Sequence, residues 1–212
     1  NPRLSKLIEF YNTWYVPNNM ALILVGDFDA EAAKPMIAET FSRLQPKELP
    51  ARPSYPDVQL AGSKHYNLGY SPQIAWVYPG VKANDPEQEV LEFVCNLLSN
   101  GQTGLLDKIT IDGEVQYAGV GLDARRNTGR IIIQAVPYYD ANQQMFESDK
   151  ATEKIVMKEI DKIKAGDISD EMIASLKRMY AQSYKVANES SESKMNWLLS
   201  AFMYNMPLEQ VL

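Results

Sequence analysis

The segment from Met20 to Val25 constrains the fold most, because it is a continuous apolar run with no polar residue in alternation. A run of this kind is typical of a β-strand that is covered on both faces. Pro17 and the pair Asn18-Asn19 precede it and favour the end of a helix. The sequence therefore predicts a helix, a strand and, beyond Gly26, a second helix in close succession.

Apolar residues recur at helical spacing on both sides of this predicted strand. The first predicted helix runs from Leu4 to Tyr15. In the second helix, Asp29 is expected to accept backbone N–H bonds as the N-cap, and Pro35 to kink the helix or delay its start. The expected core face of the second helix consists of Met36, Ile37, Phe41 and Leu44.

The composition indicates a globular chain and argues against two classes of partner. Of the 212 residues 45% are apolar, which is enough to bury a sizeable core. Acidic residues outnumber basic ones by 27 to 21, so no broad positive field is available to neutralise phosphates. The longest apolar runs fall far below the roughly 20 residues of a membrane helix. We therefore expect neither nucleic-acid binding nor membrane insertion.

A proline-rich stretch marks the main domain boundary. Four prolines lie between Pro46 and Pro56 among polar residues, which favours an extended connector. Beyond the connector, Val58 to Leu68 and Ile74 to Tyr78 are predicted strands. The single cysteine, Cys95, allows no internal disulfide and is expected to be a small apolar core residue.

Capping residues and glycines divide the rest of the chain. Asp85, Pro86 and Gln88 form a strong start signal for a helix. Gly101 suits the left-handed residue after this helix, and Thr103 the cap of the next, short helix. The remaining predicted elements are strands Val115–Asp123 and Arg130–Val136 with a turn at Arg125–Gly129, a helix from about Asn142 to Ala165 stopped by Gly166, a helix capped by Ser169, and a last helix that Pro207 ends. Strand pairs interrupted by helices indicate α+β architecture.

The order of several motifs resembles the M16 family of zinc metallopeptidases, which are the insulinase and pitrilysin-like enzymes. The run FYNTWYVPNNMALILVGDFD is similar to the segment that links the first and second units of that family. Gln73 before the strand IAWVYPG, Asp85-Pro86 at a helix start, the loop from Asn100 to Gly104 and the run Gly166 to Ser169 follow in the family's order. The resemblance covers nearly the whole chain, and the order of the motifs carries it.

This resemblance implies a fold and a domain division. The fold is expected to be an α+β unit with an antiparallel β-sheet of about five or six strands and helices packed on one face. Residues 1–45 would be the closing helix-strand-helix element of a preceding unit, 46–56 the connector, and 57–212 a second unit without its own closing strand. Met20–Val25 would then fill the vacant sheet edge, within the chain or by exchange between chains, or leave a bare edge prone to pairing.

The zinc site of the family does not fit this sequence. That site needs the motif H-x-x-E-H on a helix, whereas His65 is the only histidine here. We therefore expect no catalytic and no metal-binding residue in this chain, with the zinc and its glutamate base on a catalytic unit of the parent protein. His65 lies between Lys64 and Tyr66 in a polar stretch and is interpreted as an exposed strand or turn residue. No nucleophile-elbow pattern supports a catalytic triad.

The resemblance also points to residues that would hold a peptide. In some members the second unit anchors the N-terminal end of the substrate through a strand before its first long helix and through the glycine loop after that helix. The matching residues here are Tyr70, Gln73, Ile74, Asn100, Gly101, Gln102 and Thr103. The loop also has a plainer interpretation as a turn between two helices.

Two other groups of side chains have both a binding and a structural interpretation. Arg125, Arg126 and Arg130 flank the predicted hairpin turn and could hold a peptide carboxylate or be solvated turn residues. Aromatic residues on or beside predicted strands could line a peptide-binding edge or be ordinary half-buried sheet residues. These aromatic residues are Tyr66, Tyr70, Trp76, Tyr78, Tyr117, Tyr138 and Tyr139.

The leading hypothesis is a non-catalytic unit of an M16-like zinc metallopeptidase that forms part of a chamber and holds the peptide substrate. The alternatives are a catalytically inactive scaffold or assembly protein of the same fold, and a stand-alone peptide-binding module. Expected partners are a peptide or unfolded polypeptide and the other M16 units, in the same protein or in a partner subunit. The resemblance alone suggests the bacterial periplasm or cell envelope as the location.

Overall fold

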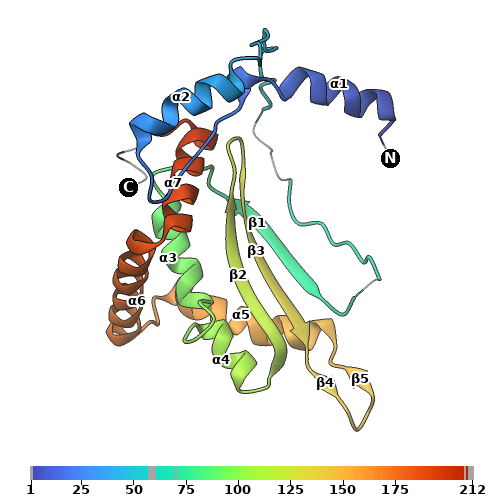
Figure 1. The fold of residues 1–212 in the computed structure, drawn as a ribbon. Coiled ribbons are helices and arrows are strands. Elements are labelled where there is room, and N and C mark those ends of the chain that lie inside the picture. The colour runs from blue at the N-terminus through green and yellow to red at the C-terminus, as the bar shows by residue number, and fades with distance from the viewer. Residues whose placement is uncertain (1, 57–60, 70, 208, 210–212) are drawn as a thin grey trace. The chain divides into compact units, whose positions relative to one another are not determined.

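A three-stranded antiparallel sheet is the centre of one part of the chain, residues 56–183. Its strands are β1 (Ile74–Gly80), β2 (Val115–Ala124) and β3 (Gly129–Pro137), in the order β1-β3-β2, so that β3 lies in the middle (Figure 1). The three strands predicted at these positions are confirmed. The structure is a computed structural model and describes residues 2–56, 61–69, 71–207 and 209.

The register gives the sheet two different faces. Ile133 of β3 pairs with Trp76 of β1 and Val120 of β2, so these three apolar side chains share one face. Ile132, the next residue along β3, pairs with Val77 and with a glycine of β2 on the opposite face. The alternation thus places Trp76, Val120 and Ile133 on one face, and Val77 and Ile132 with a glycine of β2 on the other.

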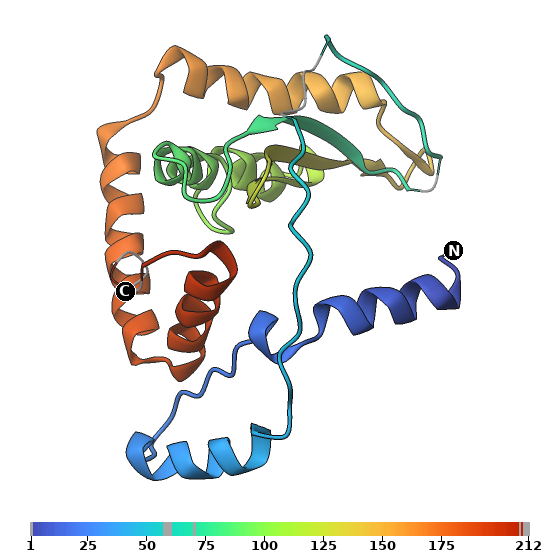
Figure 2. The same ribbon diagram turned by 90° about the horizontal axis from the view of Figure 1, so that it is seen from above.

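Three helices cover the apolar face, so the predicted α+β fold with helices on one face is confirmed. They are α3 (Gln88–Leu98), α4 (Leu105–Ile111) and α5 (Asp149–Ala165). In Figure 2, α5 lies across the sheet, while α3 and α4 lie beside β2. The shared core consists of Leu98, Leu106, Ile109, Val115, Ala118, Ile133, Ala135 and Val156. Leu106 and Val156 are both 0% exposed, so α4 and α5 are fixed to the sheet by burial.

The sheet is smaller than the resemblance implies. Within the described residues it has three strands, and a separate hairpin is formed by β4 (Tyr139–Asp140) and β5 (Met145–Phe146). This hairpin takes up residues that were predicted to begin the long helix at Asn142. That prediction is corrected: α5 begins at Asp149, where the hydroxyl of Ser148 caps it. Its predicted end is confirmed, because Gly166 adopts a left-handed φ of 70°.

Capping chemistry also moves the start of α3. Asp85 accepts a hydrogen bond from the Glu87 backbone N–H at 2.9 Å, and therefore caps a turn rather than the helix. The helix begins at Gln88, whose side chain accepts from the Asn84 backbone N–H at 2.8 Å. Val90, which the helical pattern places on the buried stripe, is 66% exposed. The buried residues of α3 are Cys95, Leu97 and Leu98.

The strand predicted over Val58–Leu68 is not formed where the structure can be read. Residues 61–68 have no helix or strand, and 58–60 lie outside the described residues. The alternation of these residues is therefore not sufficient for a strand. A strand also needs a partner, and β1 pairs with β3 rather than with this segment.

The second part of the chain contains the residues up to Tyr55 and those from Tyr184 onward. Its elements are α1 (Leu4–Trp14), a short 3-10 turn (Pro17–Asn19), α2 (Ala30–Phe41), the end of α6 (Asp170–Glu189) and α7 (Ser191–Tyr204). Residues from Tyr184 onward thus group with the N-terminal segment rather than with the sheet. Tyr184 stacks on Trp197 of α7 with ring centroids 6.4 Å apart, which joins the end of α6 to α7.

Local signals in this second part are confirmed, whereas its expected packing is not. Asp29 caps α2 by accepting from the N–H groups of Glu31 and Ala32 at 2.8 and 3.2 Å. The helix starts before Pro35, so Pro35 does not delay it. Met36, predicted to face a core, is 69% exposed. Phe41 and Leu44 of the same predicted face are exposed as well, at 46% and 43%.

Met20–Val25 forms no strand and belongs to no sheet in the part of the chain that the structure describes. The prediction that it fills the sheet edge within the chain is therefore wrong. The reason is that an apolar run specifies a strand only when a partner strand is present. The nearby connector, 46–56, also has no helix or strand, and Asn18 holds it through two hydrogen bonds with the Lys47 backbone at 2.8 and 3.2 Å.

The core predicts a sharp difference between two leucine variants. Leu106→Ala should lower the free energy of unfolding by about 2–5 kcal/mol, because it leaves a cavity between α4 and the sheet. Leu7→Ala on α1, where the side chain is 51% exposed, should change it by less than about 0.5 kcal/mol. Urea unfolding followed by circular dichroism measures both. Equal effects of the two variants would contradict the assignment of the core.

Candidate functional site

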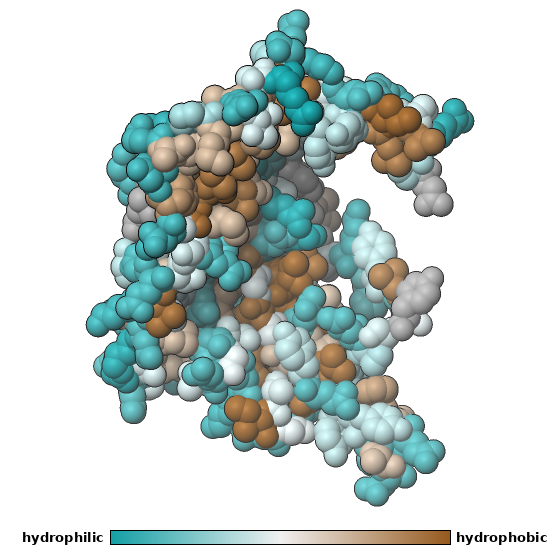
Figure 3. Space-filling model, in the orientation of Figure 1, coloured by the Kyte–Doolittle hydropathy of each residue, from teal (hydrophilic) through white to brown (hydrophobic). Residues whose placement is uncertain are grey.

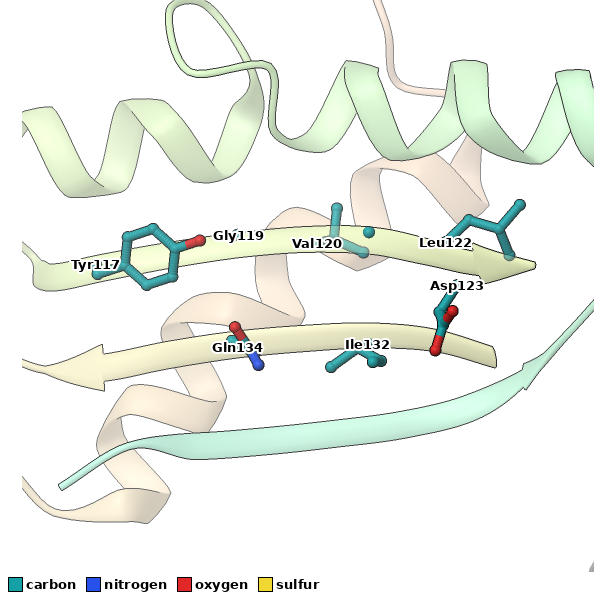
Figure 4. A pocket seen from close by; sticks show the side chains of 8 residues that line it. Tyr117, Gly119, Val120, Leu122, Asp123, Ile132 and Gln134 are labelled. Carbon is teal, nitrogen blue, oxygen red and sulfur yellow. The ribbon is translucent and has the colours of Figure 1, made fainter. Parts of the chain in front are cut away.

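The uncovered face of the sheet carries a groove of about 320 Å³. Figure 4 looks onto this face, with α5 behind the strands. Residues of β2 and β3 line the groove, among them Tyr117, Gly119, Gly121, Asp123, Ile132 and Gln134. Figure 3 views the same face and shows apolar side chains gathered over the middle of the sheet with polar ones around them. The sheet therefore offers one concave, mixed apolar and polar surface.

Two glycines of β2 keep the floor of this groove flat. At Gly121, a Cβ atom would meet no heavy atom within 4 Å, so the position is open to a ligand. At Gly119, the same space is taken by the hydroxyl of Tyr117, whose ring lies along the strand toward it (Figure 4). A glycine inside a strand often marks a place where another chain or ligand approaches the backbone.

A carboxylate between two arginines forms one end of the groove. Asp123 accepts from Nε of Arg125 at 2.9 and 3.1 Å and from Nε of Arg130 at 2.9 Å. The hydrogen bond from Arg125, helped by that from Arg130, holds the pKa of the Asp123 carboxyl below its ordinary value, against the opposing effect of burial. Asp123 therefore stays ionised and orients both guanidinium groups.

These charged residues also line a second, smaller hollow. It has a volume of about 120 Å³ and is bounded by Asp123, Arg125, Thr128 and Arg130. The two hollows share Asp123, so they adjoin. Two guanidinium groups and one carboxylate thus meet at this end of the sheet.

The glycine loop predicted to hold a peptide is closed by its own hydrogen bonds. Asp107, which is only 8% exposed, accepts from the backbone N–H groups of Asn100, Gln102 and Gly104 at 2.9, 3.0 and 2.9 Å. It also accepts from the hydroxyl of Ser99 at 3.1 Å. A buried carboxylate that accepts several N–H bonds fixes the loop conformation. The sequence argument did not identify Asp107, because it placed the helix cap at Thr103 and not at Gly104, from which Asp107 is the third helical residue.

The side chain of Asn100 also serves the loop itself. Its oxygen accepts from the N–H groups of Gln102 and Thr103 at 3.0 and 2.9 Å, and its nitrogen donates to the Asn96 carbonyl at 3.0 Å. Gly101 has a φ of 81°, so its predicted left-handed conformation is confirmed. Thr103 was predicted to cap α4, but the cap is Gly104, which packs directly against the Leu98 carbonyl of α3.

Gln73 and Ile74 lie at the start of β1, on the opposite edge of the sheet from this loop. The strand register nevertheless places the start of β1 and the loop at the same position along the strands. Ala75 pairs with Gln134, Gln134 pairs with Gly119, and a Cβ on Gly119 would lie 3.5 Å from Ser99, the residue before the loop. The two predicted binding segments are thus separated by the width of the sheet and do not touch. Tyr70 lies outside the described residues.

The two edges of the sheet differ in how well they are covered. On β2, the Ala118 N–H donates to the hydroxyl of Thr110 in α4 at 3.1 Å. This helix therefore provides a hydrogen-bond acceptor for one backbone N–H of that edge strand. On the other edge, β1 pairs with β3 and with no second strand among the described residues. An edge strand with one partner presents unpaired backbone groups to a further strand.

The aromatic residues do not form one surface. Trp76 lies on the helix-covered face, and its indole nitrogen donates to Glu153 of α5 at 3.4 Å. Tyr117 lies on the open face, and Tyr139 makes an edge contact with Phe146 in the β4–β5 hairpin. Tyr66, Tyr78 and Tyr138 are exposed. The described aromatic residues are therefore spread over both faces of the sheet, the β4–β5 hairpin and segments without regular structure.

The remaining candidates have simple environments. His65 is exposed in a segment without regular structure. Cys95 is 6% exposed, as predicted, and burial together with the nearby Glu92 raises the pKa of its thiol. Across the described residues, no group of three His, Cys, Asp or Glu side chains could hold a metal ion. The family's zinc motif needs two histidines, and the sequence has one. None of the helices within the described ranges is long and apolar enough to cross a membrane.

Replacing the carboxylate that closes the loop tests its role. Asp107→Asn exchanges one accepting oxygen for an N–H donor among four donors, so it should lower the free energy of unfolding by about 1–3 kcal/mol. Asp112→Asn, at the exposed C-terminal end of α4, is the matched control and should change it by less than about 0.5 kcal/mol. Thermal unfolding measures both, and an unaffected Asp107→Asn variant would contradict this role.

The arginine pair predicts an acid-side dependence of stability. The native pKa of Asp123 lies below the ordinary value of about 3.9, so its stabilising effect is full above that pH and is lost as the pH falls through the native pKa. Carboxyl NMR titration should show this low pKa, and Arg125→Gln should raise it toward the ordinary value. Arg178→Gln on α6 should leave it unchanged, and an ordinary pKa in the unmodified chain would refute the pairing.

Comparison with known proteins gives the family. Residues 3–180 match the family model described as the Peptidase M16 inactive domain. Over a stretch of 40 residues, the chain is 45% identical in sequence to the probable zinc protease PqqL of Escherichia coli. This stretch is 19% of this chain and 4% of PqqL.

Solved structures share the fold over nearly the whole chain. A protease from Helicobacter pylori superposes with a TM-score of 0.78 at 17% identity, covering 97% of this chain and 50% of the other. The peptidase M16 inactive domain from Pseudomonas fluorescens superposes with a TM-score of 0.77 at 19% sequence identity. The match covers 99% of this chain and 49% of the other. The periplasmic protease PqqL from Escherichia coli superposes with a TM-score of 0.68 at 18% sequence identity. The match covers 98% of this chain and 24% of PqqL. The chain thus spans about half or less of these proteins, and it belongs to the M16 peptidase family as an inactive M16 domain.

Proposed function

We propose that this chain is the non-catalytic, substrate-holding unit of an M16 zinc metallopeptidase, and that its sheet forms part of the wall of a peptide chamber. The observation that carries the proposal is the one-sided sheet of an inactive M16 domain, with its helices on one face and a groove on the other. In this proposal the uncovered face and the β1 edge together hold an extended segment of substrate.

The β1 edge supplies backbone recognition. A peptide that pairs with β1 would gain main-chain hydrogen bonds, and side-chain pockets along the sheet would add selectivity. Gln73 directly precedes β1 and is exposed, so its amide can donate to and accept from a peptide backbone at the mouth of that edge. This edge is therefore suited to unfolded polypeptide, whose backbone groups are available.

The chemistry of the reaction belongs elsewhere in this proposal. With one histidine, this chain cannot supply the two-histidine zinc motif, and zinc-activated water would be generated on a catalytic unit. What the present residues contribute is position: they hold one part of the substrate so that another part reaches the metal. A substrate-holding surface of this kind acts mainly on binding rather than on the chemical step.

Gln73→Ala in the intact peptidase tests this proposal. Loss of one peptide hydrogen bond, worth about 0.5–1.5 kcal/mol, should raise KM about 2- to 12-fold and leave kcat nearly unchanged. Gln73 is the cleaner probe than Asn100, because Asn100 holds its own loop together. Gln143→Ala in the β4–β5 turn is the matched control.

The outcomes separate the proposal from its competitor. An unchanged KM would remove the substrate-holding role of the β1 edge. An intact protein that shows no zinc-dependent cleavage of any unfolded polypeptide would instead favour an inactive scaffold of the same fold.

A further inference from the structure

Resting on the proposed function, we infer that the groove on the open face binds an extended peptide that carries a carboxylate, and that Arg130, supported by Arg125, holds this carboxylate at the turn end of the sheet. The inference names the class of substrate segment that this surface selects. It follows from the charge, the length and the side-chain order of the groove.

The charge at the turn end fits a carboxylate. Asp123 engages Nε of Arg130, and among the described residues the Arg130 side chain makes no other hydrogen bond. The side chain is 49% exposed, so its remaining N–H groups are accessible. A guanidinium that is already oriented by one carboxylate can bind a second through two parallel hydrogen bonds.

The middle of the groove fits an apolar side chain. Val77, Ile132 and Gly121 form one row across the open face, and Val77 is 57% exposed. Along β3, Ile132 of this row lies two residues, about 6.6 Å, from Arg130. The empty space above Gly121 receives a side chain that the floor itself does not fill.

The far end of the groove fits the peptide backbone. Gln134 lies four residues from Arg130 on the same face of β3, a span of about 13 Å. Its amide and the hydroxyl of Tyr117 both line the groove and can donate and accept. The groove thus matches about four residues of extended chain, with the carboxylate at one end and an apolar side chain two residues before it.

Fluorescence anisotropy with the full 212-residue chain tests the inference. Three fluorescein-labelled hexapeptides of alternating alanine and valine differ only at the last residue: glutamate with a C-terminal amide, glutamine with a C-terminal amide, and glutamine with a free C-terminus. At least one of the two carboxylate peptides should bind about tenfold or more tighter than the neutral peptide, as expected for hydrogen bonds to a charged group. Which one does so distinguishes an acidic side chain from a free chain end.

Variants locate the binding. Arg130→Gln should abolish the preference for the carboxylate peptide, whereas Arg178→Gln on α6 should preserve it. Gly121→Val should weaken all three peptides about tenfold or more by filling the groove. Its fold should be retained, because a Cβ there meets nothing and valine suits a strand. Circular dichroism checks this.

The binding results distinguish a failure of the carboxylate site from a failure of the proposed peptide-holding function. Equal affinity for charged and neutral peptides, or a preference that survives Arg130→Gln, would overturn the carboxylate site and leave the proposed peptide-holding function in place. If no peptide binds at any concentration tested, both this inference and the peptide-holding role of the uncovered face fail.

Discussion

Burial of only one face of the sheet is the constraint on which the rest of this structure depends. The sheet has three strands, and α3, α4 and α5 all contribute to a single core against the same side of it. Removal of that apolar surface from water stabilises the unit at roughly 25 cal/mol per Å². Because the helices are committed to one side, the other side is free to carry residues that a core excludes. Asp123, Arg130 and Gln134 all occupy that side.

Under the proposed function, this asymmetry would let a domain without the metal motif contribute to substrate binding. Catalysis needs a zinc site on one unit, but binding energy from parts of the substrate remote from the reacting bond also contributes to the rate. A sheet with one open face can provide such contacts without a catalytic group of its own. The loop before α4 borders this surface, because Asp107 fixes the conformation of the loop and Ser99, which precedes the loop, lies next to Gly119 of β2.

Features specified by neighbouring residues could be predicted from the sequence. Asp29 and Ser169 cap helices through bonds to residues two or three positions away, and Gly166 ends α5 by its own backbone conformation. Prediction was wrong where a distant partner decides the structure. Met20–Val25 has the composition of a strand but no partner strand among the described residues. The candidate site shows the same division: the glycine loop was recognisable locally, whereas the convergence of Arg125 and Arg130 on Asp123 required the hairpin register.

The unpartnered Met20–Val25 segment has a consequence for the behaviour of the chain in concentrated solution. It is a six-residue stretch without charge or proline, and Leu22 and Leu24 are 54% and 48% exposed. Short segments of this composition are able to stack into cross-β fibrils. The acidic residues Asp27 and Asp29 follow it closely and oppose such stacking by charge repulsion, as gatekeeper residues do. The exposed leucines of this segment and the two carboxylates that follow it therefore act in opposite directions on the association of one copy of the chain with another.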